Sequence, residues 1–256
     1  MNDLAELIEL LRRNRLNEMA ERLERQEADN DKRPTLKRLL EIVRAHAEGK
    51  EGRSLRRRTR EARLRIESAD IKDVLLTRER GLLKSDLDPF RSGAWVRERE
   101  HLVIVGESGR GTTFLACALA QVALRDGLRV RYTEVQDLIS GWYAAHDARR
   151  SEEFVKDIQN VDLLVVDDWG NTDEALGAED IRALRRCVRP MLDHRSVLIA
   201  SKHPPENLTG WLRGRETASE IVGTLADVAH RLELKGPSLR TRRARPQTRG
   251  AERSSR

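Results

Sequence analysis

The chain has 256 residues; 36% of them are charged, 4% are aromatic, and the formal net charge is +6. No apolar run approaches the roughly 20 residues of a membrane-spanning helix, and residues 1–6 lack the basic start and apolar stretch of a signal peptide. These features argue against a membrane or secreted protein, so we expect a cytosolic one with no membrane partner. The net positive charge suits a nucleic-acid partner without requiring one.

Residues 1–50 predict a small helical module. Apolar residues recur every three or four positions along two stretches that are separated near Asn14, and a third helix begins at Thr35, directly after Pro34. The apolar stripes of such helices suit two interpretations equally. They form either a bundle that packs on the rest of the chain or a docking surface for a partner protein.

Residues 51–100 combine an arginine-rich segment with a linker of turns and short helical pieces. Seven arginines fall within the thirteen positions 53–65, and like charges this dense weaken a helix unless something neutralises them. A solvated helix face is the simpler interpretation, but guanidinium groups match phosphate well. We favour a contact with the backbone of duplex DNA, without base stacking because the segment has no aromatic residue. The predicted nucleic-acid residues are Arg53, Arg56, Arg57, Arg58, Arg60, Arg63 and Arg65.

Residues 101–239 alternate between short apolar runs and helical patterns. Strands separated by helices predict an α/β fold, a parallel sheet with helices on both faces. Cys117 and Cys187 fall in two of these helices and are expected to be buried thiols. Residues 240–256 form an arginine-rich tail that we expect to be disordered, either an arm on nucleic acid or only a solubilising tail. The predicted strands are 102–105, 130–133, 162–168, 196–201 and 231–234, and the predicted helices are 112–125, 135–146, 152–158, 178–193 and 218–229.

A glycine-rich turn follows the first predicted strand and precedes a helix, which is the setting of a phosphate-binding loop. Gly106 and Gly111 have the spacing G-x-x-x-x-G, and such glycines let backbone N–H groups point at a phosphate. Thr113 stands where a hydroxyl would hold Mg²⁺, whereas Thr112 stands where a lysine would reach the phosphates of ATP. The predicted ATP-binding residues are Gly106, Glu107, Ser108, Gly109, Arg110, Gly111, Thr112 and Thr113.

Two carboxylates, Asp167 and Asp168, end the apolar strand at 162–168. The functional loops of a parallel sheet lie at the carboxyl ends of its strands, so we expect both carboxylates beside the glycine loop. Asp167 would then orient Mg²⁺, and Asp168 would align the attacking water. Ser201, which ends the next strand, is a further catalytic candidate because it would sense the terminal phosphate.

Three further stretches have a distinctive sequence: residues 115–120, residues 161–170 with the string Asp-Asp-Trp-Gly, and residues 229–240 with the string His-Arg-Leu-Glu-Leu-Lys-Gly. Together they resemble the IstB transposition-helper ATPases, which are AAA+ relatives of the DnaC helicase loader. The resemblance implies an AAA+ P-loop fold and ATP bound between the subunits of a homo-oligomer, which assembles on duplex DNA and directs a partner transposase. It also implies that the N-terminal helices serve assembly or partner binding.

Two positions depart from that family pattern. Thr112 replaces the loop lysine, and Thr224 stands where the family has the arginine finger of an Asp-Arg-Leu string. Losing one such charge costs on the order of 3–4 kcal/mol of transition-state stabilisation. The chain is therefore either a helper ATPase or a hydrolysis-deficient DNA-binding scaffold on the same fold. We predict weak hydrolysis that Thr112→Lys would raise, unless Arg110, Lys202 or Arg231 supplies a missing charge.

Overall fold

The computed structural model describes residues 3–29, 33–170, 176–208 and 216–240. The chain divides into two compact units, Met1–Arg57 and Arg58–Arg256, and the division falls inside one long helix. Nearly all of the predicted tail, from residue 241 onward, lies outside the described residues. No helix in the described ranges is both long and apolar enough to cross a membrane. The cytosolic location stays a prediction.

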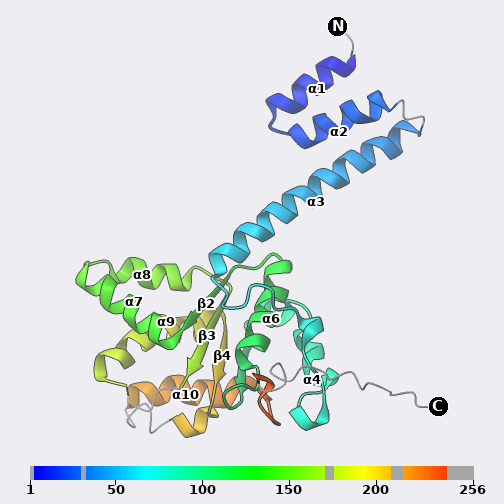
Figure 1. The fold of residues 1–256 in the computed structure, drawn as a ribbon. Helices are drawn as coiled ribbons and strands as arrows, with labels where there is room; N and C mark the ends of the chain where they lie inside the picture. Colours follow the sequence, from blue (N-terminus) through cyan, green and yellow to red (C-terminus); the bar gives the residue numbers. More distant parts are fainter. Residues whose placement is uncertain (1–2, 30–32, 171–175, 209–215, 241–256) are drawn as a thin grey trace, which may run out of the picture. The chain divides into compact units, whose positions relative to one another are not determined.

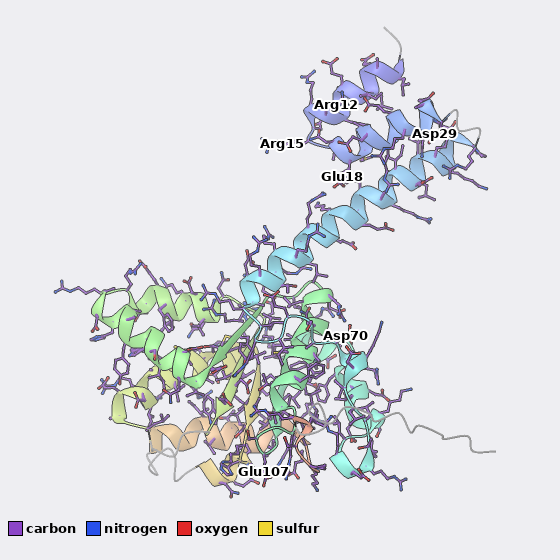
Figure 2. All side chains as sticks on the ribbon, in the orientation of Figure 1. Arg12, Arg15, Glu18, Asp29, Asp70 and Glu107 are labelled. Carbon is purple, nitrogen blue, oxygen red and sulfur yellow. The ribbon has the colours of Figure 1, made fainter. Side chains whose placement is uncertain are left out.

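The first unit contains the three predicted helices, α1 (Asp3–Arg13), α2 (Asn17–Ala28) and the beginning of α3 (Thr35–Ala62). The predicted break after α1 is confirmed, since Arg15 has a φ of 59° and the side-chain amide of Asn14 donates to the Leu10 carbonyl at 2.9 Å. Arg12 of α1, labelled in Figure 2, forms an ion pair with Glu24 of α2 at 2.9 Å. The unit has a small core that includes Ala20, Leu23 and Ile42, and its exposed apolar residues include Leu7, Leu10, Leu39, Leu40 and Val43.

The second unit begins with the last turn of α3 and continues with a linker of short turns and helices, as predicted. Its elements are η1 (Ile71–Asp73), η2 (Arg78–Arg80), α4 (Lys84–Leu87), η3 (Asp88–Phe90) and α5 (Ala94–Arg97). The strand and helix pattern follows, and each predicted boundary agrees with the structure to within two residues. The strands are β1 (His101–Val105), β2 (Val130–Glu134), β3 (Leu163–Trp169), β4 (Ser196–Ser201) and β5 (Ala229–Glu233). The helices are α6 (Thr112–Arg125), α7 (Val135–Asp147), α8 (Ser151–Gln159), α9 (Ala178–His194), η4 (Pro205–Leu208) and α10 (Glu216–Val228).

The five strands form one parallel sheet in the order β2-β3-β4-β1-β5. A parallel pair needs a crossover connection, and the helices supply these connections. β1 lies between β4 and β5, with Leu102 opposite Leu198 on one side and opposite His230 on the other. This order places the end of β1, where the glycine loop begins, next to the end of β4. The end of β3 lies on the far side of β4, so that β4 separates it from β1.

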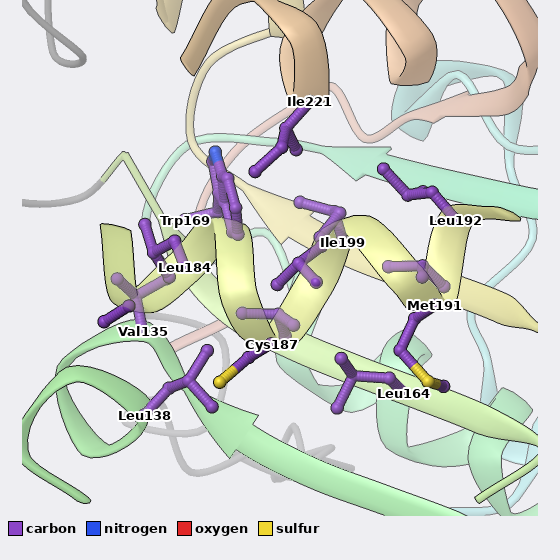
Figure 3. Close-up of a cluster of buried hydrophobic side chains, with 14 of the residues drawn as sticks. Val135, Leu138, Leu164, Trp169, Leu184, Cys187, Met191, Leu192, Ile199 and Ile221 are labelled. Carbon is purple, nitrogen blue, oxygen red and sulfur yellow. The ribbon is translucent and has the colours of Figure 1, made fainter. Parts of the chain in front are cut away.

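Helices cover both faces of the sheet, as predicted (Figure 1). On one face, side chains of β1, β3 and β4 pack with α7, α8, α9 and α10 in a single apolar cluster that includes Leu164, Trp169 and Ile199 (Figure 3). The opposite face is covered by α6, in which every residue from Leu115 to Leu124 is buried. Full burial of a large apolar side chain contributes roughly 1.5–3 kcal/mol, so this double-sided core holds the edges of the sheet in place.

The predicted buried thiols are confirmed. Cys117 of α6 and Cys187 of α9 are free and fully buried. Burial raises the pKa of Cys117 to about 11 and that of Cys187 to about 12. Because the thiolate is the reactive form, both residues act as small apolar core residues.

At the edge of the sheet where the strands begin, here called the amino edge, polar side chains bind backbone groups. The His101 ring accepts the N–H of Val197 at Nδ1 (3.3 Å), and its Nε2 lies 3.1 Å from the Leu192 carbonyl. These partners require the neutral tautomer with the proton on Nε2. Burial lowers the pKa of His101 from its usual value. The buried Ser196 hydroxyl donates to the Val96 carbonyl at 3.2 Å.

Candidate nucleotide-binding site

The glycine loop joins β1 to α6, as predicted. The N–H of Gly106 donates to the Ser201 carbonyl at 3.0 Å, so the loop starts as an extension of the β1–β4 ladder. Gly109 and Gly111 have φ values of 83° and 88°, in the left-handed region that glycine adopts without strain. Gly111 is also the N-cap of α6. The loop therefore ends at the positive end of a 14-residue helix, where an anion is stabilised.

The segment after β5 is attached to this loop. The N–H of Leu239 donates to the Gly109 carbonyl at 2.8 Å, and the N–H of Leu234 donates to the Val105 carbonyl at 2.7 Å. A Cβ atom at Gly109 would clash with the hydroxyl oxygen of Ser238. The left-handed φ and this close approach together require glycine at position 109. Residues 234–239 thus hold the loop in its shape, a role that the sequence pattern did not indicate.

A cavity of about 600 Å³ opens beside the loop, which falls in the size range of small-molecule sites. Apolar side chains form part of its wall, including Ile66, Val74, Leu75 and Phe114. Polar and charged side chains form the rest. They are Ser68, Asp73, Arg80, Ser108, Thr112, Thr113, Asp167, Asp168, Ser201, Lys202 and Arg240.

Six of the eight predicted loop residues line this cavity. They are Gly106, Ser108, Gly109, Gly111, Thr112 and Thr113. Glu107, labelled in Figure 2, pairs instead with Arg110 at 2.6 Å between Oε2 and Nη2. The other terminal nitrogen of Arg110 donates to the Leu234 carbonyl at 3.2 Å. Of the three candidates for the missing positive charge, Lys202 lines the cavity. The guanidinium of Arg110 is bound outside the cavity, and that of Arg231 pairs with Glu206 at 2.8 Å.

Asp167 is almost fully buried and is held by two hydrogen bonds. Its Oδ2 accepts from the hydroxyl of Tyr132 at 2.7 Å, and its Oδ1 accepts from the N–H of Asp168 at 2.8 Å. Burial first, and the Asp167 charge second, raise the pKa of Tyr132, so this phenol remains a hydrogen-bond donor. Tyr132 of β2 thus fixes the carboxylate orientation at the cavity, and sequence reasoning missed it because cross-strand pairing is not visible in a local pattern.

Asp168 lies at an irregularity in β3. The β3–β4 register shifts between Val166 and Trp169, and Asp168 has a φ of 57°. Such a bulge redirects a side chain. The Oδ2 atom of Asp168 lies 3.6 Å from Nη1 of Arg65, and the same nitrogen pairs with Glu134 at the end of β2. Glu134 is the main cause of the raised pKa of Arg65. Arg65, predicted as a DNA contact, therefore lies beside Asp168, one of the carboxylates of the cavity.

Ser201 lines the cavity at the end of β4, where it was predicted, but its hydroxyl is already engaged. Its oxygen lies 2.8 Å from the Trp169 carbonyl and 2.6 Å from the His203 carbonyl, and it accepts the His203 N–H at 3.2 Å. The sensor role stays a prediction, and a phosphate would have to compete with these backbone partners.

The remaining arginines of the predicted DNA segment have different surroundings. The segment is helical as far as Ala62, and Arg63 ends the helix with a φ of 55°. Arg53 pairs with Glu18 inside the first unit. Arg58 is half-buried and donates to the Leu124 carbonyl at 3.1 Å. The exposed members are Arg53, Arg56, Arg57, Arg60, Arg63 and Arg65.

Two further basic side chains at the cavity, Arg80 and Arg240, were missed by sequence reasoning. Arg80 is 7% exposed, and Arg240 follows the segment that is attached to the loop. Both lie in arginine-rich surroundings in the sequence, so no local signal distinguishes them from solvated arginines. Thr224, at the predicted finger position, is half-buried in α10.

Solved structures with the same fold include the DnaI structure, the DnaC helicase loader and DnaA from Aquifex aeolicus. The DnaI structure has a TM-score of 0.56 and 18% identity, covering 66% of this chain and 92% of that one. The DnaC helicase loader has a TM-score of 0.53 and 18% identity, covering 65% of this chain and 97% of that one. AMPPCP-bound DnaA has a TM-score of 0.55 and 17% identity, covering 66% of this chain but only 50% of that one. These likenesses confirm the predicted AAA+ P-loop fold.

Sequence comparison identifies the family. Two relatives from Sinorhizobium fredii are named as insertion-sequence ATP-binding proteins. One, y4pL, is 33% identical over 75% of this chain and 78% of its own length, and the other, y4uH, is 29% identical over 83% and 86%. The model of the family described as "IstB-like ATP binding protein" matches residues 9–247. The match spans both units, and the chain therefore belongs to the IstB-like ATP-binding protein family.

Proposed function

We propose that this protein binds Mg²⁺–ATP and acts with duplex DNA and a transposase as a helper of insertion-sequence transposition. One observation carries the nucleotide part of the proposal. The glycine loop, Thr113, Asp167 and Asp168 all line one cavity of about 600 Å³ at the carboxyl edge of the sheet. The names of the relatives and the family support the insertion-sequence setting.

The residues around the cavity suit a nucleotide with a metal ion. The backbone of 106–113, at the N-terminus of α6, would hold the phosphates. Thr113 and Asp167 would hold Mg²⁺, which keeps most of its ligands as water and phosphate oxygens. The bound ion would neutralise part of the phosphate charge. Asp168 and Ser201 remain the candidates for aligning water and sensing the terminal phosphate, and the apolar wall at Ile66 and Leu75 would take the base.

Hydrolysis is the second question. Thr112 lines the cavity where the family has a lysine, and Thr224 lies at the finger position in α10. Both departures favour the alternative candidate, a hydrolysis-deficient DNA-binding scaffold that uses ATP as a structural ligand. We expect saturable ATP binding with little turnover, and we expect Thr112→Lys to raise turnover.

The test is calorimetric titration of the full chain with ATP and Mg²⁺, followed by phosphate release with and without duplex DNA. Binding without turnover supports the scaffold, and binding with DNA-stimulated turnover supports the ATPase. No heat and no thermal shift at millimolar ATP would contradict nucleotide binding. Fast turnover that Asp168→Asn abolishes would show that the two missing charges are dispensable.

The DNA part of the proposal rests on the exposed arginines of α3. We expect the triple change Arg56→Ala, Arg57→Ala, Arg60→Ala to weaken binding to any duplex sequence. The salt dependence of log K should fall by about 0.9 for each phosphate contact that is lost. A matched control removes three ion-paired arginines elsewhere, Arg91, Arg182 and Arg186, and thereby loses the same charge. If the two triple variants lost the same DNA affinity, the loss would come from net charge and the contact through α3 would be contradicted.

A further inference from the structure

Arg80 occupies an unusual position for an arginine. It ends η2 in the linker before the sheet, its side chain is 7% exposed, and it lines the cavity described above. An arginine is rarely buried so completely. Its guanidinium stays protonated in proteins, so the positive charge is brought permanently to this wall.

The guanidinium of Arg80 lies against the glycine loop. Its Nη2 donates to the Arg110 carbonyl at 2.5 Å, and its Nη1 donates to the Leu75 carbonyl at 3.1 Å. A Cβ atom at Gly111 would lie 3.3 Å from Nη2. The charge therefore lies at the Arg110–Gly111 turn, immediately before Thr112, where the loop lysine is missing.

The backbone of Arg80 is fixed from two directions, so the position of its charge is set by the fold. Its N–H is capped by the Thr77 hydroxyl oxygen at 3.3 Å, and its carbonyl accepts the N–H of Lys235 at 2.7 Å. The linker and the segment after β5 thus hold Arg80 between them. Because the guanidinium is also bonded to the Leu75 and Arg110 carbonyls, the side chain loses little further freedom when an anion binds, which favours binding.

We infer that Arg80 supplies the positive charge beside the phosphate loop that position 112 no longer carries, and that it makes the site selective for nucleoside triphosphates over monophosphates. The inference rests on the proposed nucleotide binding. Two observations carry it: the buried guanidinium that contacts the loop, and the threonine at the usual lysine position. Arg80 also binds the loop carbonyl of Arg110, so its contribution of charge must be separated from its support of the loop.

The experiment compares the affinities of the full chain for ATP, ADP and AMP, each with Mg²⁺, by calorimetry. We expect Arg80→Gln to weaken ATP binding at least tenfold and AMP binding less than threefold, because the charge acts on the β- and γ-phosphates. Arg78→Gln is the matched control. Arg78 lies in the same short helix η2 but is exposed and does not line the cavity, and we expect the ATP affinity of this variant to change less than threefold.

A second variant separates charge from support. Thr112→Lys restores a cation inside the loop, so the double variant Arg80→Gln, Thr112→Lys should recover most of the ATP affinity. If Arg80 only supports the loop, the single variant should weaken all three nucleotides alike and the lysine should not rescue it. That result overturns the inference. If Arg80→Gln does not fold, Arg80→Lys is the deciding variant. It keeps the positive charge, so it should keep the ratio of ATP affinity to AMP affinity. Loss of that ratio overturns the inference.

The outcomes separate this inference from the proposed function. If the unaltered chain binds none of the nucleotides, both fail. If the unaltered chain prefers ATP and Arg80→Gln keeps the same preference, only the role of Arg80 fails and the nucleotide site stands.

Discussion

The two edges of the sheet both carry buried or half-buried polar side chains, but in different settings. At the amino edge, the side chains of His101 and Ser196 are buried and bound to backbone groups of neighbouring elements. At the carboxyl edge, Asp167, Asp168 and Ser201 line an open cavity beside the glycine loop. Both edges carry polar groups, and among the described residues those of the carboxyl edge face a cavity that a ligand could fill.

The direction of the strands explains this difference. In a parallel sheet all carboxyl ends lie together, and the helices that follow start there with their positive N-termini. The C-terminal ends of helices lie at the amino edge, and their free carbonyls accept hydrogen bonds from polar side chains. The Leu192 carbonyl of α9 binds the His101 ring in this way. Changes at the amino edge should therefore affect stability, and matched changes at the carboxyl edge should affect binding.

The largest expected effect comes from Asp167, near the carboxyl end of β3. Asp167→Asn should weaken Mg²⁺–ATP binding by about ten- to a hundredfold, since a charge-assisted interaction contributes roughly 1.5–3 kcal/mol. Asparagine keeps an acceptor for Tyr132, so folding should persist. The control is Asp162→Asn, before the start of β3, where the carboxylate accepts the Arg129 N–H at 2.9 Å and pairs with Arg195 at 3.2 Å.

Calorimetry and denaturant unfolding of both variants make the comparison. Asp162→Asn should lower the free energy of unfolding by about 1 kcal/mol and leave nucleotide affinity unchanged. Equal losses of affinity in the two variants would mean that the edges do not differ in the way described above.

The next effect concerns pH and the amino edge. The pKa of folded His101 is lowered by burial, so the unfolded chain binds this proton more readily than the folded chain does. The stability that neutral His101 provides is therefore present above its usual pKa of about 6.5 and is lost as the pH falls from there toward the lowered folded value. His101→Gln should remove this pH dependence and lower the free energy of unfolding by about 1–3 kcal/mol at pH 7.5.

Urea unfolding between pH 5 and 8, with and without the substitution, measures the effect. For a unit of this size, 1 kcal/mol corresponds to a shift of about 2–4 °C in Tm. Ser196→Ala, which removes a buried hydroxyl that does not titrate from the same edge, is the control, and it should lower the free energy of unfolding by the same amount at every pH. A pH profile that is the same before and after His101→Gln would contradict the assignment.

The smallest effect comes from the ion pairs at the two edges. Arg65 approaches Asp168 at the carboxyl edge, and Arg195 pairs with Asp162 at the amino edge. Exposed pairs of this kind contribute about 0.2–1 kcal/mol, so Arg65→Gln and Arg195→Gln should each change the free energy of unfolding by less than that upper value. Only Arg65→Gln should alter ATP affinity, by less than about threefold and less still at high salt. A change of more than tenfold would give Arg65 a direct part in binding.

The sequence pattern alone was sufficient for the elements of the second unit and for much of the cavity. Strands and helices follow from local hydrophobic periodicity, which is why the bounds of α6 and β4 agree with the prediction. The glycine loop and Asp167 were placed at one edge because parallel topology dictates where strand ends meet. These properties depend on neighbours in the chain and on general rules of connection, so they can be read before the fold is known.

Tertiary structure alone decided where these arginine side chains lie. Arg58 binds the Leu124 carbonyl and Arg65 approaches Asp168, although the sequence predicted both as DNA contacts. Arg80, for which the sequence predicted no role, binds the Arg110 carbonyl. The contacts join residues that are 30 or more positions apart. Burial of an arginine depends on such distant partners and not on its neighbours in the chain. The sequence thus determined that a phosphate loop lacks its lysine, and only the folded chain brought another permanent cation beside it.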